Sequence, residues 1–73
     1  MNRKEIRKQT CIVIRKNGQY LIGTILYSDE LRWGYSVFDA WRTRDREEAR
    51  SVARVTGGIM MLFNPIIGKT KMM

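Results

Sequence analysis

Apolar side chains dominate residues 10–16, many of them β-branched, and this stretch predicts a β-strand; a second strand is predicted over residues 19–27. The dipeptide Asn17-Gly18 separates the two stretches and favours the type I′ turn of a tight β-hairpin. Both strands are apolar on both faces. The hairpin is therefore expected near the centre of a sheet, or with its second face covered by a partner subunit.

Two further strands are expected later in the chain. Residues 31–37 alternate between large apolar and small or charged side chains, although Gly34 could end this strand early and leave residues 34–39 as a loop. A short apolar stretch over residues 59–63 predicts the last strand, which Asn64-Pro65 ends.

One helix is predicted between these strands. Asp45 is a good N-cap, and Glu48 stands three residues later, as in a capping box. Gly57-Gly58 provides a left-handed stop at the other end. Small apolar and neutral side chains recur at helical spacing between these signals: Ala49, Val52, Ala53 and Thr56. The sequence therefore predicts an α+β fold of order β-β-β-α-β, with one helix packed on a small antiparallel or mixed sheet.

The chain of 73 residues is expected to form one domain over residues 10–65. Residues 1–9 are interpreted as a basic N-terminal arm and residues 66–73 as a C-terminal tail. Cys11 is the single cysteine and histidine is absent, so neither an internal disulfide nor a common zinc site is expected. We expect no cofactor, no membrane span and a cytoplasmic location.

Catalysis is not expected from this composition. No histidine is present to act as a general base, and no neighbouring group is placed to activate Cys11, which is interpreted as a buried apolar side chain. Three acidic residues, Asp45, Glu47 and Glu48, fall in the first turn of the predicted helix, where the helix dipole favours negative charge. We therefore interpret the protein as a binding module and not as an enzyme.

The formal net charge of +7 is unevenly distributed. Residues 1–16 hold six basic side chains and one acid, residues 42–54 hold five arginines and three acids, and the tail adds two lysines. Such a charge attracts polyanions, although small proteins also need net charge to stay in solution.

Arginines recur every four residues along the predicted helix, which places them on one flank of it. Guanidinium groups pair with two phosphate oxygens at once. Exposed charge runs are also common on ordinary protein surfaces. Aromatic side chains beside basic ones can stack nucleobases, and Trp33 and Tyr35 have that setting, whereas Trp41 and Phe63 are interpreted as core residues. The candidate contact residues are Arg42, Arg44, Arg46, Arg50, Arg54, Arg32, Trp33, Tyr35, Arg3, Lys4, Arg7 and Lys8.

The segment from residue 31 to residue 63 resembles a loosely defined class of small uncharacterised proteins encoded by bacteriophages and prophages. The matching pieces are a Trp-containing segment (Leu31-Arg32-Trp33), an Asp-Ala-aromatic-x-Thr stretch (Asp39 to Thr43), a capped helix with Glu48-Ala49, the Gly57-Gly58 stop and a final strand. The resemblance implies a phage or mobile-element accessory protein in a bacterial cytoplasm. It implies nothing about individual functional residues.

The leading hypothesis is therefore a small basic accessory protein that binds nucleic acid through the arginine-rich flank of its helix. The alternative is an inhibitor or counter-defence protein that binds an acidic surface of a host protein. A homodimer that shares the apolar hairpin face is a third alternative.

Overall fold

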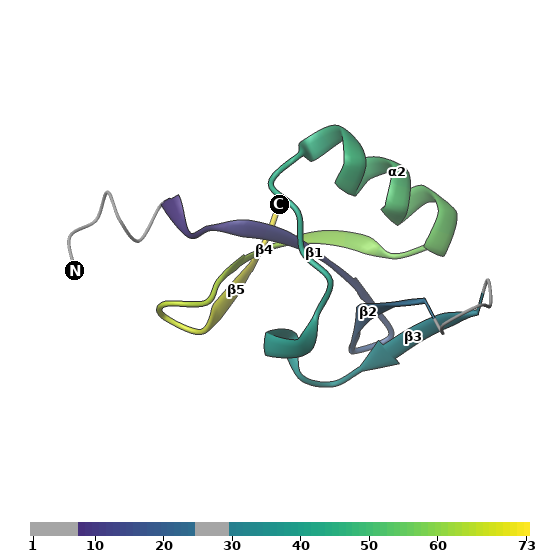
Figure 1. Cartoon of the computed structure of the whole chain (residues 1–73), viewed down its shortest axis with the longest axis horizontal. Helices are drawn as coiled ribbons and strands as arrows, with labels where there is room; N and C mark the ends of the chain where they lie inside the picture. The colour runs from purple at the N-terminus through teal and green to yellow at the C-terminus, as the bar shows by residue number, and fades with distance from the viewer. Residues whose placement is uncertain (1–7, 25–29) are drawn as a thin grey trace.

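The computed structural model describes residues 8–24 and 30–73 and contains a five-stranded antiparallel sheet with one helix packed against it (Figure 1). The order of strands across the sheet is β3-β2-β1-β4-β5. The α+β prediction is thus confirmed, and every strand pairing is antiparallel. The elements are β1 (Cys11–Lys16), β2 (Gln19–Thr24), β3 (Leu31–Gly34), a short 3₁₀ helix η1 (Val37–Asp39), α2 (Arg46–Thr56), β4 (Ile59–Asn64) and β5 (Lys69–Met72).

The predicted hairpin is present, and its turn has the expected backbone conformation. Asn17 has φ 53° and Gly18 has φ 77°, the two positive values that a type I′ turn requires. Arg15 pairs with Tyr20 across the hairpin. The predicted extension of the second strand over residues 25–27 lies outside the described residues.

β1 is the central strand, which explains why its side chains are apolar on both faces. Ile12 and Ile14 face α2, whereas Cys11 and Val13 face the opposite side, and all four are buried. On that opposite side they form a core cluster with Ala40, Met61 and Phe63 from η1's end and β4. The second apolar face of β1 is therefore covered by this chain's own residues.

The segment just before the helix is inserted between β1 and β2, where the two strands diverge from their turn. Ile12 and Thr43 exchange two backbone hydrogen bonds of 2.7 and 3.1 Å. The Trp41 amide donates to the Leu21 carbonyl oxygen at 2.8 Å. These bonds satisfy backbone groups of both strands and fix the point at which the chain enters α2.

The predicted ends of the helix are confirmed. Asp45 is the N-cap, and Gly57, with φ 75°, is the left-handed C-cap. The fully buried Ala49 lets the helix lie close to the sheet. The backbone at Gly58 also lies close to the sheet, because a Cβ built there would be 2.5 Å from Cγ2 of Ile14.

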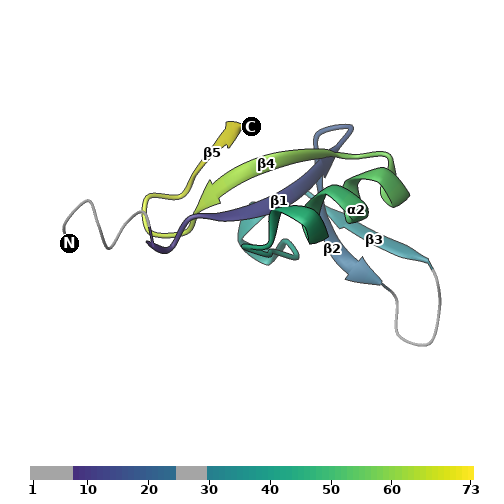
Figure 2. The same ribbon diagram turned by 90° about the horizontal axis from the view of Figure 1, so that it is seen from above.

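Two predicted boundaries change in the structure. β3 ends at Gly34, and η1 follows it, so the loop alternative for residues 34–39 is closer to the structure than a strand to residue 37. The prediction of a C-terminal tail over residues 66–73 is wrong, because Lys69–Met72 form β5 and pair with β4 (Figure 2). The tight β4–β5 turn closes through Gly68, whose amide donates to the Asn64 carbonyl oxygen at 2.8 Å.

Candidate functional site

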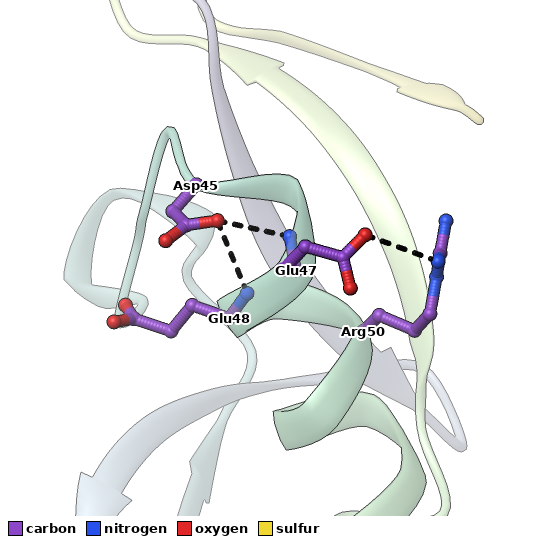
Figure 3. A network of polar contacts seen from close by, with 4 residues as sticks. All are labelled: Asp45, Glu47, Glu48 and Arg50. Carbon is purple, nitrogen blue, oxygen red and sulfur yellow. Dashed lines mark hydrogen bonds and ion pairs between the residues drawn. The ribbon is translucent and has the colours of Figure 1, made fainter.

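Three arginines occupy one exposed flank of α2, as their spacing predicted: Arg46, Arg50 and Arg54. On the other flank, Val52 lines a hollow with Leu21 and Trp41, so that flank faces β2. At 100° per residue, the arginines lie on the side of the helix axis away from Val52. They therefore face the β4 side of the molecule, and Figure 3 shows Arg50 on that side.

Acidic groups at the start of α2 serve the helix itself. The Asp45 carboxylate accepts hydrogen bonds from the amides of Glu47 and Glu48 at 3.0 and 3.3 Å (Figure 3). Glu47 also forms an ion pair with Arg50 at 3.2 Å. Both side chains of this pair are exposed to solvent, so the pair is weak and leaves Arg50 available to other anions.

Two lysines of β5 join the same side of the molecule, and sequence analysis missed them. In the β4–β5 register, Lys71 lies opposite Leu62 and Lys69 opposite Asn64. Leu62 is itself paired with Ile12, whose side chain faces α2. Since directly opposed residues of antiparallel strands share a face, both lysines lie on the helix side of the sheet. We call the five cations on this side the basic face: Arg46, Arg50, Arg54, Lys69 and Lys71.

An apolar hollow of about 440 Å³ lies beside these lysines. Apolar atoms make most of its wall. The residues that line it are Thr10, Leu62, Phe63, Asn64, Ile67, Lys69, Thr70 and Lys71. Thr10 belongs to the same side of the sheet, since it accepts a hydrogen bond from the Asn64 side chain at 3.0 Å. α2 packs on β1 and β4, and the β5 end of this side has no helix over it in the described part of the chain (Figure 2).

Arg42 does not extend the arginine flank. Its guanidinium donates to the Phe38 carbonyl oxygen at 2.9 Å and lies 5.3 Å from the centre of the Phe63 ring. Phe63 is in the core cluster on the sheet face away from α2, so Arg42 closes that core and does not belong to the basic face. Arg44 is exposed in the link between Thr43 and the helix cap.

The aromatic candidates lie at the other edge of the sheet. Arg32 and Trp33 are in β3, three strands away from β4, and Tyr35 follows β3 with 79% of its surface exposed. Trp33 is half-buried and lines a small hollow near the β1–β2 turn. The structure therefore does not bring these residues together with the arginines of α2. Of the two predicted core aromatics, Phe63 is fully buried and Trp41 is half-buried.

The predicted N-terminal footprint lies mostly outside the described residues. Arg3, Lys4 and Arg7 are not among the described residues, whereas Lys8 is described and exposed. Lys8 stands two residues before Thr10, at the end of β1 that adjoins the hollow.

Cys11 is buried, as predicted. Its thiol donates to the Phe63 carbonyl oxygen at 3.4 Å. Burial raises the pKa of the thiol above its ordinary value of 9.0, and the positive charges of Arg42 and Arg44 oppose part of that rise. A protonated, buried thiol is a poor nucleophile. Among residues 8–24 and 30–73, no three acidic or cysteine side chains gather as metal ligands would.

No family model, curated protein or solved structure matches this chain. In the described residues, no helix has the length and apolar content needed to cross a membrane.

Proposed function

We propose that this protein binds nucleic acid through the basic face. The observation that carries the proposal is the gathering of the α2 arginines and the β5 lysines on one side of the sheet. These five cations come from two elements that are separate in sequence. Glu47 is the one acid that forms an ion pair with any of them within the described residues.

The electrostatics of this surface suit a phosphate backbone. Arginine pairs with phosphate through two donors, and lysine adds a compact charge. Each phosphate that is neutralised releases counterions, so affinity for nucleic acid falls steeply as salt rises. As part of the same proposal, the protein acts in a bacterial cytoplasm as a phage or mobile-element accessory protein. That origin remains a prediction from the sequence resemblance.

Binding to a labelled oligonucleotide, measured by fluorescence anisotropy at 50 to 200 mM salt, tests this proposal. Lys71→Gln and Arg54→Gln should each weaken binding and reduce the slope of log affinity against log salt by about 0.7 to 0.9, the value for one phosphate. Arg15→Gln is the matched control. It removes one charge from the sheet face away from α2, where Arg15 lies 6.0 Å from the Tyr20 ring.

The control should keep most of the wild-type slope. If all three variants lost the same affinity and salt slope, net charge alone would drive binding, and the basic face would have no special role. Circular dichroism of each variant verifies that the fold is retained.

A protein partner is the second candidate function. Phe38 is 57% exposed although its ring packs edge-on against Phe63 at 5.4 Å. Exposed aromatic side chains of this kind are common in protein interfaces. Pull-down from nuclease-treated bacterial lysate separates the two functions, since a partner bound by Phe38 survives the nuclease and is lost in Phe38→Ser.

A further inference from the structure

Hydrogen bonds of Asn64 link two segments that line the hollow beside β5. The Asn64 side-chain oxygen accepts hydrogen bonds from the amides of Ile66 and Ile67 at 2.9 and 3.4 Å. Its side-chain nitrogen donates to Thr10, as described above. Asn64 thus joins the β4–β5 turn to the start of β1 and holds Thr10 and Ile67 at the wall of the hollow.

The wall and the rim of the hollow differ in chemistry. Leu62 and Ile67 supply apolar surface, and the two lysines of β5 stand beside them. Its volume of about 440 Å³ falls within the range of about 300 to 1,000 Å³ of small-ligand pockets. A ligand that fits must therefore present an apolar, flat or compact group next to negative charge.

Single-stranded nucleic acid has this combination, and duplex does not. In a duplex the faces of the bases are stacked inside, so the protein meets phosphates and the polar edges of the grooves. In a single strand the unstacked bases expose their faces beside the phosphates. The apolar hollow therefore gains little from contact with a duplex. On a single strand, it can remove the apolar face of a base from water.

We propose that the ligand of the basic face is single-stranded nucleic acid, with one base held in the hollow and its neighbouring phosphates on Lys69 and Lys71. The arginines of α2 then bind phosphates further along the strand. This inference rests on the proposed function and narrows it to one class of nucleic acid. Charge complementarity between the lysine rim and the phosphates selects this occupant over an uncharged apolar one.

Anisotropy titrations with three 12-nucleotide probes test this inference: single-stranded oligo(dT), a duplex of equal length, and the same single strand with abasic sites. At one salt concentration the single strand should bind at least about tenfold more tightly than the duplex. Abasic sites should weaken binding by about fivefold or more, the lower limit for one stacked base. The salt slope should stay the same, because the phosphates are unchanged.

A matched pair of variants locates the base. Ile67 lines the hollow and Ile66 does not, although the two residues are adjacent and 52% and 44% exposed. Ile67→Ser should reduce affinity for the intact single strand severalfold and leave affinity for the abasic strand unchanged. Ile66→Ser should bind both strands as the wild type does.

Different outcomes would overturn different statements. If duplex and abasic strands bind as tightly as the intact single strand, with the salt slope retained, the hollow holds no base and the proposed function survives. If no probe binds this protein more tightly than it binds an unrelated protein of equal charge, the proposed function fails together with this inference. Equal losses in Ile66→Ser and Ile67→Ser would also overturn the assignment of the hollow.

Discussion

At the scale of single residues, Cys11 shows how one position serves packing at the expense of reactivity. It lies in the central strand, belongs to the core cluster and donates its thiol proton to a backbone carbonyl group. Ionising this thiol in the folded protein would place a charge in the core.

The stability of the fold should consequently decrease at alkaline pH. The pKa of Cys11 is raised in the folded state, so the unfolded chain loses this proton first as pH rises through 9. The contribution of the protonated Cys11 thiol to folding stability is complete below the pKa of the unfolded chain. It is lost as the pH rises toward the higher pKa of the folded protein. Guanidinium denaturation at pH 7 and pH 9.5 should show a lower midpoint at the higher pH.

Cys11→Ser is the comparison for this titration, because a hydroxyl group keeps a donor for the Phe63 carbonyl oxygen and does not ionise in this range. The variant should show a smaller decrease in midpoint between the two pH values. An identical decrease in both proteins would assign the effect to lysine and tyrosine side chains and remove Cys11 from the explanation.

At the scale of elements, the helix depends on its first residue. Asp45 is the side chain that caps α2, and its carboxylate satisfies two amides that have no partner inside the helix. Asp45→Ala should lower the free energy of unfolding by about 1 kcal/mol.

Urea denaturation followed by circular dichroism measures that loss. Asp39→Ala is the control: it removes the same charge from the exposed 3₁₀ helix η1, whose N-cap Ser36 makes no side-chain cap hydrogen bond. The control should change stability by less than about 0.5 kcal/mol. If Asp39→Ala lowered the free energy of unfolding as much as Asp45→Ala does, the effect would come from the change in charge and not from the lost helix cap.

Local signals predicted most elements, and the failures have identifiable causes. The turn at Asn17-Gly18 and the two ends of α2 depend on backbone conformations that few residue types favour, so the sequence alone sufficed for them. β5 was missed because the stretch over residues 69–72 has polar Lys and Thr side chains and no β-branched apolar residue. Its pairing with β4 depends on the tight turn that closes at Gly68.

The candidate site was harder to predict than the fold. The spacing of the arginines showed that they share one flank of a helix, but only the strand order showed which edge of the sheet they face. For the same reason, the sequence did not show that the aromatic residues of β3 lie at the opposite edge of the sheet from the arginines. The hollow combines Thr10 with residues more than fifty positions later, and no local pattern reports such a juxtaposition.

At the scale of the whole molecule, the charge is a cost to the unbound protein. The net charge is +7, and the basic face brings several like charges to one side of the sheet. Like charges repel, and salt screens that repulsion over about 8 to 10 Å at physiological ionic strength.

The melting temperature should therefore increase as sodium chloride is raised from 20 to 300 mM. Salt weakens repulsion across the basic face, while the Arg50–Glu47 pair that it also weakens contributes little. Thermal unfolding followed by circular dichroism measures the change. Lys71→Gln should show a smaller increase than the wild type, and a melting temperature that falls with salt would contradict this account.

The insertion of residues 41–43 between β1 and β2 has a consequence for the order of folding. β1 holds partners at three distances along the chain: Gln19 across the tight turn, Thr43 at Ile12, and β4 over most of its length. During synthesis β1 leaves the ribosome long before β4 does. The central strand therefore lacks its main partner until residues 59–64 have been synthesised. We expect the domain to fold late and in one cooperative step, without a stable folded fragment before that point.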